Sequence, residues 1–263
     1  MYQFNYHQPQ TIEEARSLYN KSEDGLYLAG GHTLIPSLRQ RLSSPSDVID
    51  LSSIAALTGI ERQGGVLRIG ALTTHDSVAT SEAVLGHCSA LATLASGIGD
   101  AQVRNRGTIG GSIANNDPAA DYPAAILGLN ATVHTDQRDI QGDNFFSGMF
   151  ETSLWAGEMV VGISFPSVTA ASYVKFPNPA SRYATVGVMV ARIDDGVRVA
   201  ITGAASCVFR ASAMEDALSS KLSENSLDNV AIDPDTLMSD IHASAEYRAH
   251  LCGVMARKAV AGL

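Results

Sequence analysis

Ala29-Gly30-Gly31-His32-Thr33-Leu34 contains a glycine pair, and a second pair follows in Thr108-Ile109-Gly110-Gly111-Ser112-Ile113-Ala114-Asn115. We expect the chain to be organised around these two stretches. Each pair adjoins an apolar run and leads into a segment that can start a helix. Because glycine has no Cβ, such loops adopt positive φ angles and let backbone N–H groups approach an anion closely. One such loop alone is more often a tight turn than a ligand site. Two loops that face one another could clamp a pyrophosphate, with tight turns as the alternative.

The segments around the first pair predict a strand, a loop and a helix in succession. Residues 26–29 form a short apolar run typical of a buried strand, and apolar residues recur at helical spacing over 34–42. An earlier helix is indicated by Thr11 and Glu14, which have the spacing of a capping box. A second short strand is expected at 48–51.

The middle of the chain alternates sheet and helix signals. A hairpin is expected over 59–70, turning at Gly64-Gly65, and helical structure over 74–96. The Gly-rich segment 97–111 is expected to be an ordered loop, because it is too irregular for a helix or a strand. The elements expected next are a helix at 124–129 and strands at 131–135 and 158–165.

After residue 170 the pattern becomes that of antiparallel strands. These are expected at 171–176, 184–192 and 197–208, with the last two joined at Asp194-Asp195-Gly196. Helices close the chain, the last of them over 244–261. The pattern as a whole predicts the α+β class.

Composition excludes several kinds of partner. The net charge is −9 and no basic stripe is present, which argues against nucleic acid or an anionic membrane. No stretch approaches eighteen uninterrupted apolar residues, so no transmembrane segment is expected. The N-terminus lacks the basic and apolar regions of a signal peptide, which predicts a cytoplasmic protein.

The three cysteines, Cys88, Cys207 and Cys252, are far apart and form no CxxC pair. Their spacing fits a reducing compartment, with each thiol serving as a small buried residue. An iron–sulfur cluster or a structural zinc held by this chain alone is therefore not expected.

Several well-known ligand signatures are absent from the sequence. No glycine is followed by lysine, which excludes a Walker A loop, and Gly97-x-Gly99 lacks the third glycine of a Rossmann fingerprint. HExxH and GxSxG are missing as well. What remains is the two glycine pairs with hydroxyls beside them, Thr33 on one and Thr108 and Ser112 on the other.

Two carboxylates, Asp117 and Asp121, stand among prolines at the start of the expected helix at 124–129. Carboxylates in such positions cap a helix or bind hydroxyl groups, and the residues alone leave both roles open.

The chain resembles the FAD-binding medium subunits of molybdenum hydroxylases, the family of the carbon monoxide dehydrogenase flavoprotein and of the flavin domain of xanthine dehydrogenase. The resemblance rests on blocks that follow the family's order over nearly the whole length. These blocks are 29–36, 70–75, 103–114, 117–123 and 240–251.

The resemblance implies that the two glycine loops hold the FAD pyrophosphate and that Asp121 binds the sugar-alcohol chain of the flavin, helix capping being the alternative. It also places Lys175 near the flavin, with a solvated surface lysine as the alternative. Tyr183 would lie beside the isoalloxazine. His75 lies in a family segment without an assigned role and is expected to be a hydrogen-bonded structural histidine. The cofactor-binding residues implied are Ala29, Gly30, Gly31, His32, Thr33, Leu34, Thr108, Gly110, Gly111, Ser112, Asn115, Asp117, Asp121, Lys175 and Tyr183. The chain departs from many relatives at Ser112 and Asn115-Asn116, and serine still donates to a phosphate.

The fold implied is the two-subdomain FAD-binding fold of the p-cresol methylhydroxylase and vanillyl-alcohol oxidase type, with an added C-terminal antiparallel sheet and helices. Its expected divisions are an N-terminal subdomain at 1–56, a middle subdomain at 57–170 and a C-terminal domain at 171–263.

The function implied is electron transfer without a catalytic residue or metal in this chain. A large subunit would hold the molybdenum cofactor, and a small subunit would hold two [2Fe–2S] clusters. FAD in this chain would pass electrons to an external acceptor, and the assembly would be a dimer of heterotrimers. Two alternatives are a scaffold that has lost flavin binding and a stand-alone flavin oxidase. The intact glycine pairs oppose the scaffold, and the short region after residue 170 opposes the oxidase.

Overall fold

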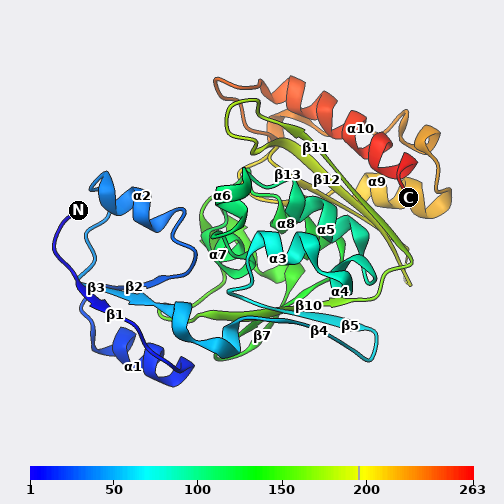
Figure 1. Cartoon of the computed structure of the whole chain (residues 1–263). Helices are drawn as coiled ribbons and strands as arrows, with labels where there is room; N and C mark the ends of the chain where they lie inside the picture. The colour runs from blue at the N-terminus through cyan, green and yellow to red at the C-terminus, as the bar shows by residue number, and fades with distance from the viewer. Residues whose placement is uncertain (195) are drawn as a thin grey trace.

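A small parallel sheet forms the N-terminal part of the molecule, drawn in blue in Figure 1. The computed structural model describes residues 1–194 and 196–263. The sheet has the order β1-β3-β2. Its strands and the two helices beside them are β1 (Asn5–His7), α1 (Ile12–Lys21), β2 (Gly25–Leu28), α2 (Leu34–Arg39) and β3 (Asp47–Asp50).

A capping box sets the start of α1, and a backbone turn sets the end of α2. The Thr11 hydroxyl accepts a hydrogen bond from the Glu14 N–H, and the Glu14 carboxylate accepts one from the Gln10 N–H, which confirms the predicted cap of α1. Helix α2 is shorter than the sequence predicts. It ends at Arg39 because the backbone turns into the left-handed region at Arg41, where φ is 61°.

A five-stranded antiparallel sheet forms one side of the middle part, with the order β4-β5-β10-β6-β7. Its strands are β4 (Ile60–Gln63), β5 (Val66–Gly70), β6 (Thr132–Thr135), β7 (Asp139–Gln141) and β10 (Val160–Pro166). The predicted hairpin turn is confirmed, since Gly64 and Gly65 both have positive φ, as a type I′ turn requires. Two 3-10 turns connect β3 to this sheet, at Leu51–Ser53 and Ala55–Leu57.

Short helices fill the space between this sheet and a second one (Figure 1). They are α3 (His75–Thr80), α4 (Glu82–Leu85), α5 (Ser89–Ser96), α6 (Ala101–Arg104), α7 (Ile109–Asn115) and α8 (Tyr122–Gly128). Every residue of α8 is buried, and its apolar side chains share one core with those of α5 and β10. This helical layer carries the second glycine pair.

The prediction that 97–111 is an irregular loop is wrong, because α6 and the start of α7 lie within it. Side-chain caps explain the difference: Asp100 accepts a hydrogen bond from Val103 N–H, and the Thr108 hydroxyl accepts one from Gly111 N–H. These caps satisfy backbone groups at the start of each short helix and offset the low helix propensity of glycine. The second glycine pair therefore stands in the first turn of a helix.

The C-terminal part is a four-stranded antiparallel sheet of order β11-β12-β13-β14, covered by α10 on the side away from the middle helices (Figure 1). Its elements are β11 (Ala170–Pro177), β12 (Ala184–Ile193), β13 (Gly196–Thr202), β14 (Phe209–Arg210), α9 (Ser212–Ser220) and α10 (Ala245–Ala261). Strand β13 ends six residues before its predicted limit, because Gly203 has a φ of +81°. The predicted turn at 194–196 includes Asp195, which lies outside the described residues.

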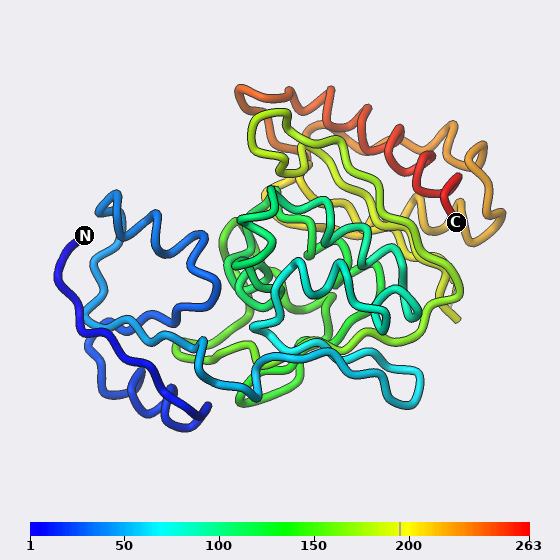
Figure 2. Tube along the Cα trace, viewed as in Figure 1, coloured from blue at the N-terminus to red at the C-terminus, as the bar shows by residue number. Residues whose placement is uncertain are grey.

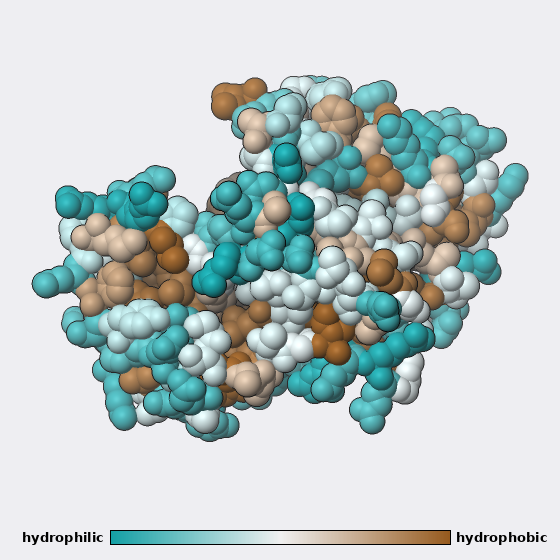
Figure 3. All heavy atoms as spheres, viewed as in Figure 1, coloured by the Kyte–Doolittle hydropathy of each residue, from teal (hydrophilic) through white to brown (hydrophobic). Residues whose placement is uncertain are grey.

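The remaining elements are small. They are the hairpin of β8 (Phe146–Gly148) and β9 (Glu151–Thr152) and the 3-10 turns Gly142–Asn144, Glu224–Leu227 and Pro234–Thr236. In Figure 2 the N-terminal part lies to one side of the rest of the trace, and the chain ends lie far apart. On the face in Figure 3, the N-terminal part carries a group of apolar residues next to the middle part. Within the described ranges, no helix is long and apolar enough to cross a membrane.

Candidate cofactor site

A cavity of about 660 Å³ opens where the N-terminal part meets the middle part and the loop before β12. This volume lies in the range of sites that hold cofactors and other small ligands. All of the predicted cofactor-binding residues except Lys175 line it. They are Ala29, Gly30, Gly31, His32, Thr33, Leu34, Thr108, Gly110, Gly111, Ser112, Asn115, Asp117, Asp121 and Tyr183.

The first glycine loop joins β2 to α2 and leaves its backbone donors free. Within the described chain, the five N–H groups from Gly30 to Leu34 donate no hydrogen bond to another residue, whereas the next one, Ile35 N–H, donates to Gly31 O over 3.0 Å. The loop can fold this way because Gly31 has a φ of +78°, which favours glycine. Consecutive unpaired amides form a concave anion site.

The second glycine pair differs, because its backbone donors are already used inside the protein. Gly110 N–H donates to Ala71 O over 2.8 Å, and Gly111 N–H donates to the Thr108 hydroxyl over 3.2 Å. Our prediction that both loops present free amides is therefore wrong for this one. Here glycine allows close approach: a Cβ on Gly110 would lie 2.5 Å from the Ala71 side chain, and one on Gly111 would lie 3.4 Å from Ala29 Cβ.

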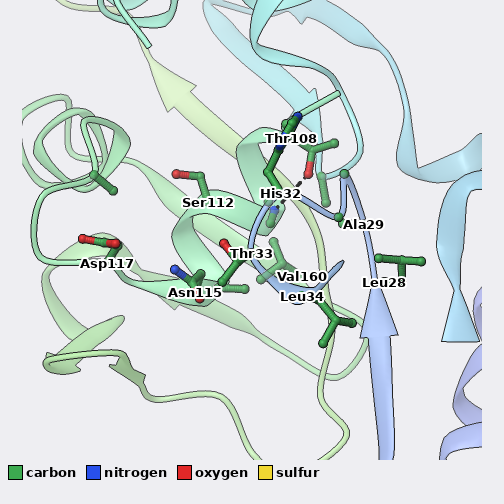
Figure 4. Close-up of a pocket in the computed structure, with 18 of the residues that line it drawn as sticks. Leu28, Ala29, His32, Thr33, Leu34, Thr108, Ser112, Asn115, Asp117 and Val160 are labelled. Atoms are coloured by element: carbon green, nitrogen blue, oxygen red, sulfur yellow. Dashed lines mark hydrogen bonds between the residues drawn. The ribbon is translucent and has the colours of Figure 1, made fainter. Parts of the chain in front are cut away.

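The two loops meet directly, and this contact shapes the floor of the cavity. A Cβ on Gly30 would lie 2.2 Å from Arg106 O and 2.9 Å from Gly107 Cα. Hydroxyl and amide side chains surround the junction, and Figure 4 shows Thr33, Ser112 and Asn115 on the walls of one space. The site thus combines free N–H groups on one wall with polar side chains on the other.

The two candidate carboxylates both line the cavity but have different hydrogen-bond partners. Asp117 accepts a hydrogen bond from Ala119 N–H over 2.9 Å and closes a local turn. Asp121 precedes α8 but makes no capping hydrogen bond, so the capping alternative for this residue is wrong. Its carboxylate instead contacts the Tyr173 hydroxyl at 2.5 Å and the Lys175 ammonium at 2.9 Å.

Lys175 and Tyr183 lie at the same end of the cavity. Lys175 is not a surface lysine, because its side chain is only 10% exposed, and it stands behind the wall that Asp121 forms. Tyr183 is half exposed and lines the opening.

His75 is the first residue of α3, and its role differs from the prediction. It is buried and lines the cavity, but its Nδ1 has no hydrogen-bond partner among the described residues, so the expected hydrogen-bonded histidine is wrong. Its ring lies 5.3 Å from the Tyr122 ring, and its Nε2 lies against Gly107. Burial, with smaller contributions from the nearby His32 and Arg104, lowers the pKa of His75 to about 4. The ring is therefore neutral at pH 7.

Sequence reasoning missed a further group of residues in the cavity wall. Arg182 and Ser181 come from the loop before β12, while Leu154, Met159 and Val160 come from the segment that leads into β10. These residues lack a motif. The pairing of β10 with β5 and β6 places the last three, and the pairing of β11 with β12 places the loop of Arg182 and Ser181, so no local pattern could have revealed them.

Comparison with known proteins agrees with this architecture. Residues 2–168 match the family model described as the FAD-binding domain in molybdopterin dehydrogenase, and residues 171–263 match that of the CO dehydrogenase flavoprotein C-terminal domain. The nicotine 6-hydroxylase medium subunit of Paenarthrobacter nicotinovorans is 35% identical, with 97% of this chain and 95% of that protein covered. The carbon monoxide dehydrogenase medium chain of Hydrogenophaga pseudoflava is 31% identical, with 98% and 96% covered.

Solved structures give the same result. A chain of the Cu,Mo-CO dehydrogenase matches with a TM-score of 0.91 and 31% identity, covering 98% of this chain and 96% of that chain. The chain belongs to the FAD-binding medium subunits of the molybdenum hydroxylase family. It is an oxidoreductase subunit with the fold predicted for that family.

The residues present fit the cofactor that defines the family. A diphosphate needs donors close together, and the free amides of the first glycine loop supply them without any lysine. When bound, FAD supplies the capacity to accept and release electrons, while the protein supplies binding and orientation. The described residues contain no group of three or more His, Cys, Asp or Glu side chains placed to hold a metal ion.

Proposed function

We propose that this chain carries FAD and transfers electrons from the [2Fe–2S] clusters of a small partner subunit to an external acceptor. The substrate would be hydroxylated in a large partner subunit that holds the molybdenum cofactor. The relatives named as medium chains support this division of labour, because that name implies further subunits.

One observation carries the cofactor assignment. The run of unpaired N–H groups from Gly30 to Leu34 belongs to a loop that lines the same cavity as the hydroxyl of Ser112 and the amide of Asn115. Leaving so many donors unpaired costs free energy unless a ligand or water accepts from them. A diphosphate has enough acceptor oxygens to satisfy them at once.

The proposal includes the roles of the other cavity residues. Asp121 would accept a hydrogen bond from a hydroxyl of the sugar-alcohol chain, since its four lone-pair sites exceed what Tyr173 and Lys175 occupy. Tyr183, at the opening, would lie beside the isoalloxazine.

The proposed organisation extends beyond the site. We divide the chain at 1–56, 57–170 and 171–263, so that the first glycine loop, the second and the Lys175 strand come from different units. The assembly would be a cytoplasmic dimer of heterotrimers, with a quinone, NAD, a cytochrome or dioxygen as acceptor.

The test is the variant Gly111→Val in the chain expressed with its partner subunits. The added side chain would fill the space beside Ala29 and Thr108, so we expect lower FAD content with unchanged solubility. Gly253→Ala in α10 is the control, because its nearest neighbour would be 3.7 Å away. Wild-type complex that holds no FAD after reconstitution would refute the function, and unchanged FAD in Gly111→Val would refute the clamp.

A further inference from the structure

The side chain of Lys175 is buried in a site that uses all of its hydrogen-bonding capacity. Its ammonium donates to Gly97 O over 2.8 Å, to Asp121 Oδ2 over 3.0 Å and to Arg182 O over 3.0 Å. An ammonium has three N–H donors, so these three acceptors leave none for a ligand. A lysine that contacted the cofactor directly would need a free donor.

The three acceptors belong to three separate segments of the cavity wall. Asp121 lines the cavity itself, Gly97 leads into the lining residues Ile98 and Gly99, and Arg182 lines the opening. Lys175 does not line the cavity, but its ammonium contacts these three segments. It lies on β11 of the C-terminal sheet and thereby joins that sheet to the middle helices.

The loop that carries Arg182 joins β11 to β12, and Lys175 connects it to the middle helices. The loop closes on itself through two backbone hydrogen bonds of 2.8 Å, from Asn178 N–H to Tyr183 O and from Arg182 N–H to Asn178 O. Two hydrogen-bonded links join it to the Gly97–Gly99 segment. Lys175 bridges Arg182 O and Gly97 O, and the Arg182 guanidinium donates to Gly99 O over 3.1 Å.

Lys175 also acts on the protonation of Asp121. The pKa of the Asp121 carboxyl is raised, because burial outweighs the Lys175 ammonium and the Tyr173 hydroxyl, which both lower it. Without the ammonium the effect of burial would be opposed by a neutral hydroxyl alone. The carboxyl would then take up a proton at a higher pH.

We propose that Lys175 is a positioning residue, whose ammonium pairs with the Asp121 carboxylate and ties it to the Gly97 turn and the 178–183 loop, without touching the cofactor. This rests on the proposed function, since Asp121 is taken to bind a hydroxyl of FAD. The effect of Lys175 on FAD binding then passes through Asp121, and it depends on pH.

The experiment measures the Kd of FAD for the deflavinated complex between about pH 5.5 and 8.5, in wild type and in Lys175→Met. We expect the Kd of Lys175→Met divided by that of wild type to rise as pH falls. The rise should reach up to about tenfold for each pH unit below the raised pKa of Asp121 in the variant. Lys258→Met is the control, because Lys258 is exposed on α10.

Other groups near Asp121 do not imitate this result. The pKa values of Tyr122, Tyr173 and Tyr183 are all raised, so these hydroxyls stay neutral over that range. His75 has a pKa of about 4, below the range of the measurement. Asp117 and Arg182 are present in both proteins, so their contributions cancel in the ratio.

A double variant keeps the test decisive if Lys175→Met folds poorly. Asp121→Asn with Lys175→Met removes both charges, which a buried site tolerates better than one unpaired charge. We expect its Kd ratio to be independent of pH. A ratio that is constant with pH in both variants would overturn the inference but leave the FAD assignment intact. Failure of the wild-type complex to bind FAD would overturn the proposed function.

Discussion

Gly30→Ala tests whether FAD binding depends on the contact between the two glycine loops. The new Cβ would lie 2.2 Å from Arg106 O and 2.9 Å from Gly107 Cα. Both atoms belong to the backbone, so rotation of a side chain cannot relieve the overlap. The loops must therefore move apart by about 1 Å to reach ordinary van der Waals separation.

The cost follows from the size of this overlap. Forcing one methyl group into a packed site costs about 1–3 kcal/mol. If the free protein relieves the overlap by separating the loops, FAD must close them again at that cost. The expected result is a Kd for FAD that rises about 5- to 150-fold.

The assay is fluorescence titration of the deflavinated complex with FAD, alongside thermal unfolding. Gly253→Ala is the matched control, because its Cβ meets only the end of Arg257 at 3.7 Å, and its Kd should equal that of wild type. An unchanged Kd in a well-folded Gly30→Ala complex would refute the reasoning, because the binding site would then tolerate separated loops.

Two further predictions concern stability. His75 has a pKa of about 4 in the folded protein, below its ordinary value of 6.5. The folded state therefore binds fewer protons than the unfolded state between these pH values. The stability that this residue provides above pH 6.5 is lost as pH falls toward 4. The variant His75→Gln removes this loss. The difference in unfolding free energy between wild type and variant, measured by urea titration, should change by about 2 kcal/mol between pH 7 and 5. A difference that stays constant with pH would contradict the assignment. Arg248→Met should lower the free energy of unfolding by about 3 kcal/mol. It leaves Thr185 O and Gly203 O buried without the Arg248 donor that each now has at 2.6 Å. A loss of stability no larger than that of the control Arg257→Met would show that water replaces the guanidinium.

Local sequence signals were enough for most elements. The Thr11 cap, the Gly64-Gly65 turn and the final helix are each confirmed, because their signals act within a few residues. The prediction for the segment 97–111 was wrong, because the structure of this segment does not depend on local propensity alone. Its helices depend on side-chain caps that outweigh glycine propensity, and Gly110 N–H finds its acceptor in the distant turn at Ala71.

The candidate site divides in the same way. The order of residues was enough to locate the two glycine pairs, the hydroxyls beside them and the family that they indicate. That Gly30 to Leu34 keep their amides free while Gly110 and Gly111 do not is visible only in the folded chain. The same holds for Lys175, which contacts Asp121 from behind the wall of the cavity. A donor is available only if no acceptor lies within about 3 Å, and most of those acceptors come from distant parts of the chain.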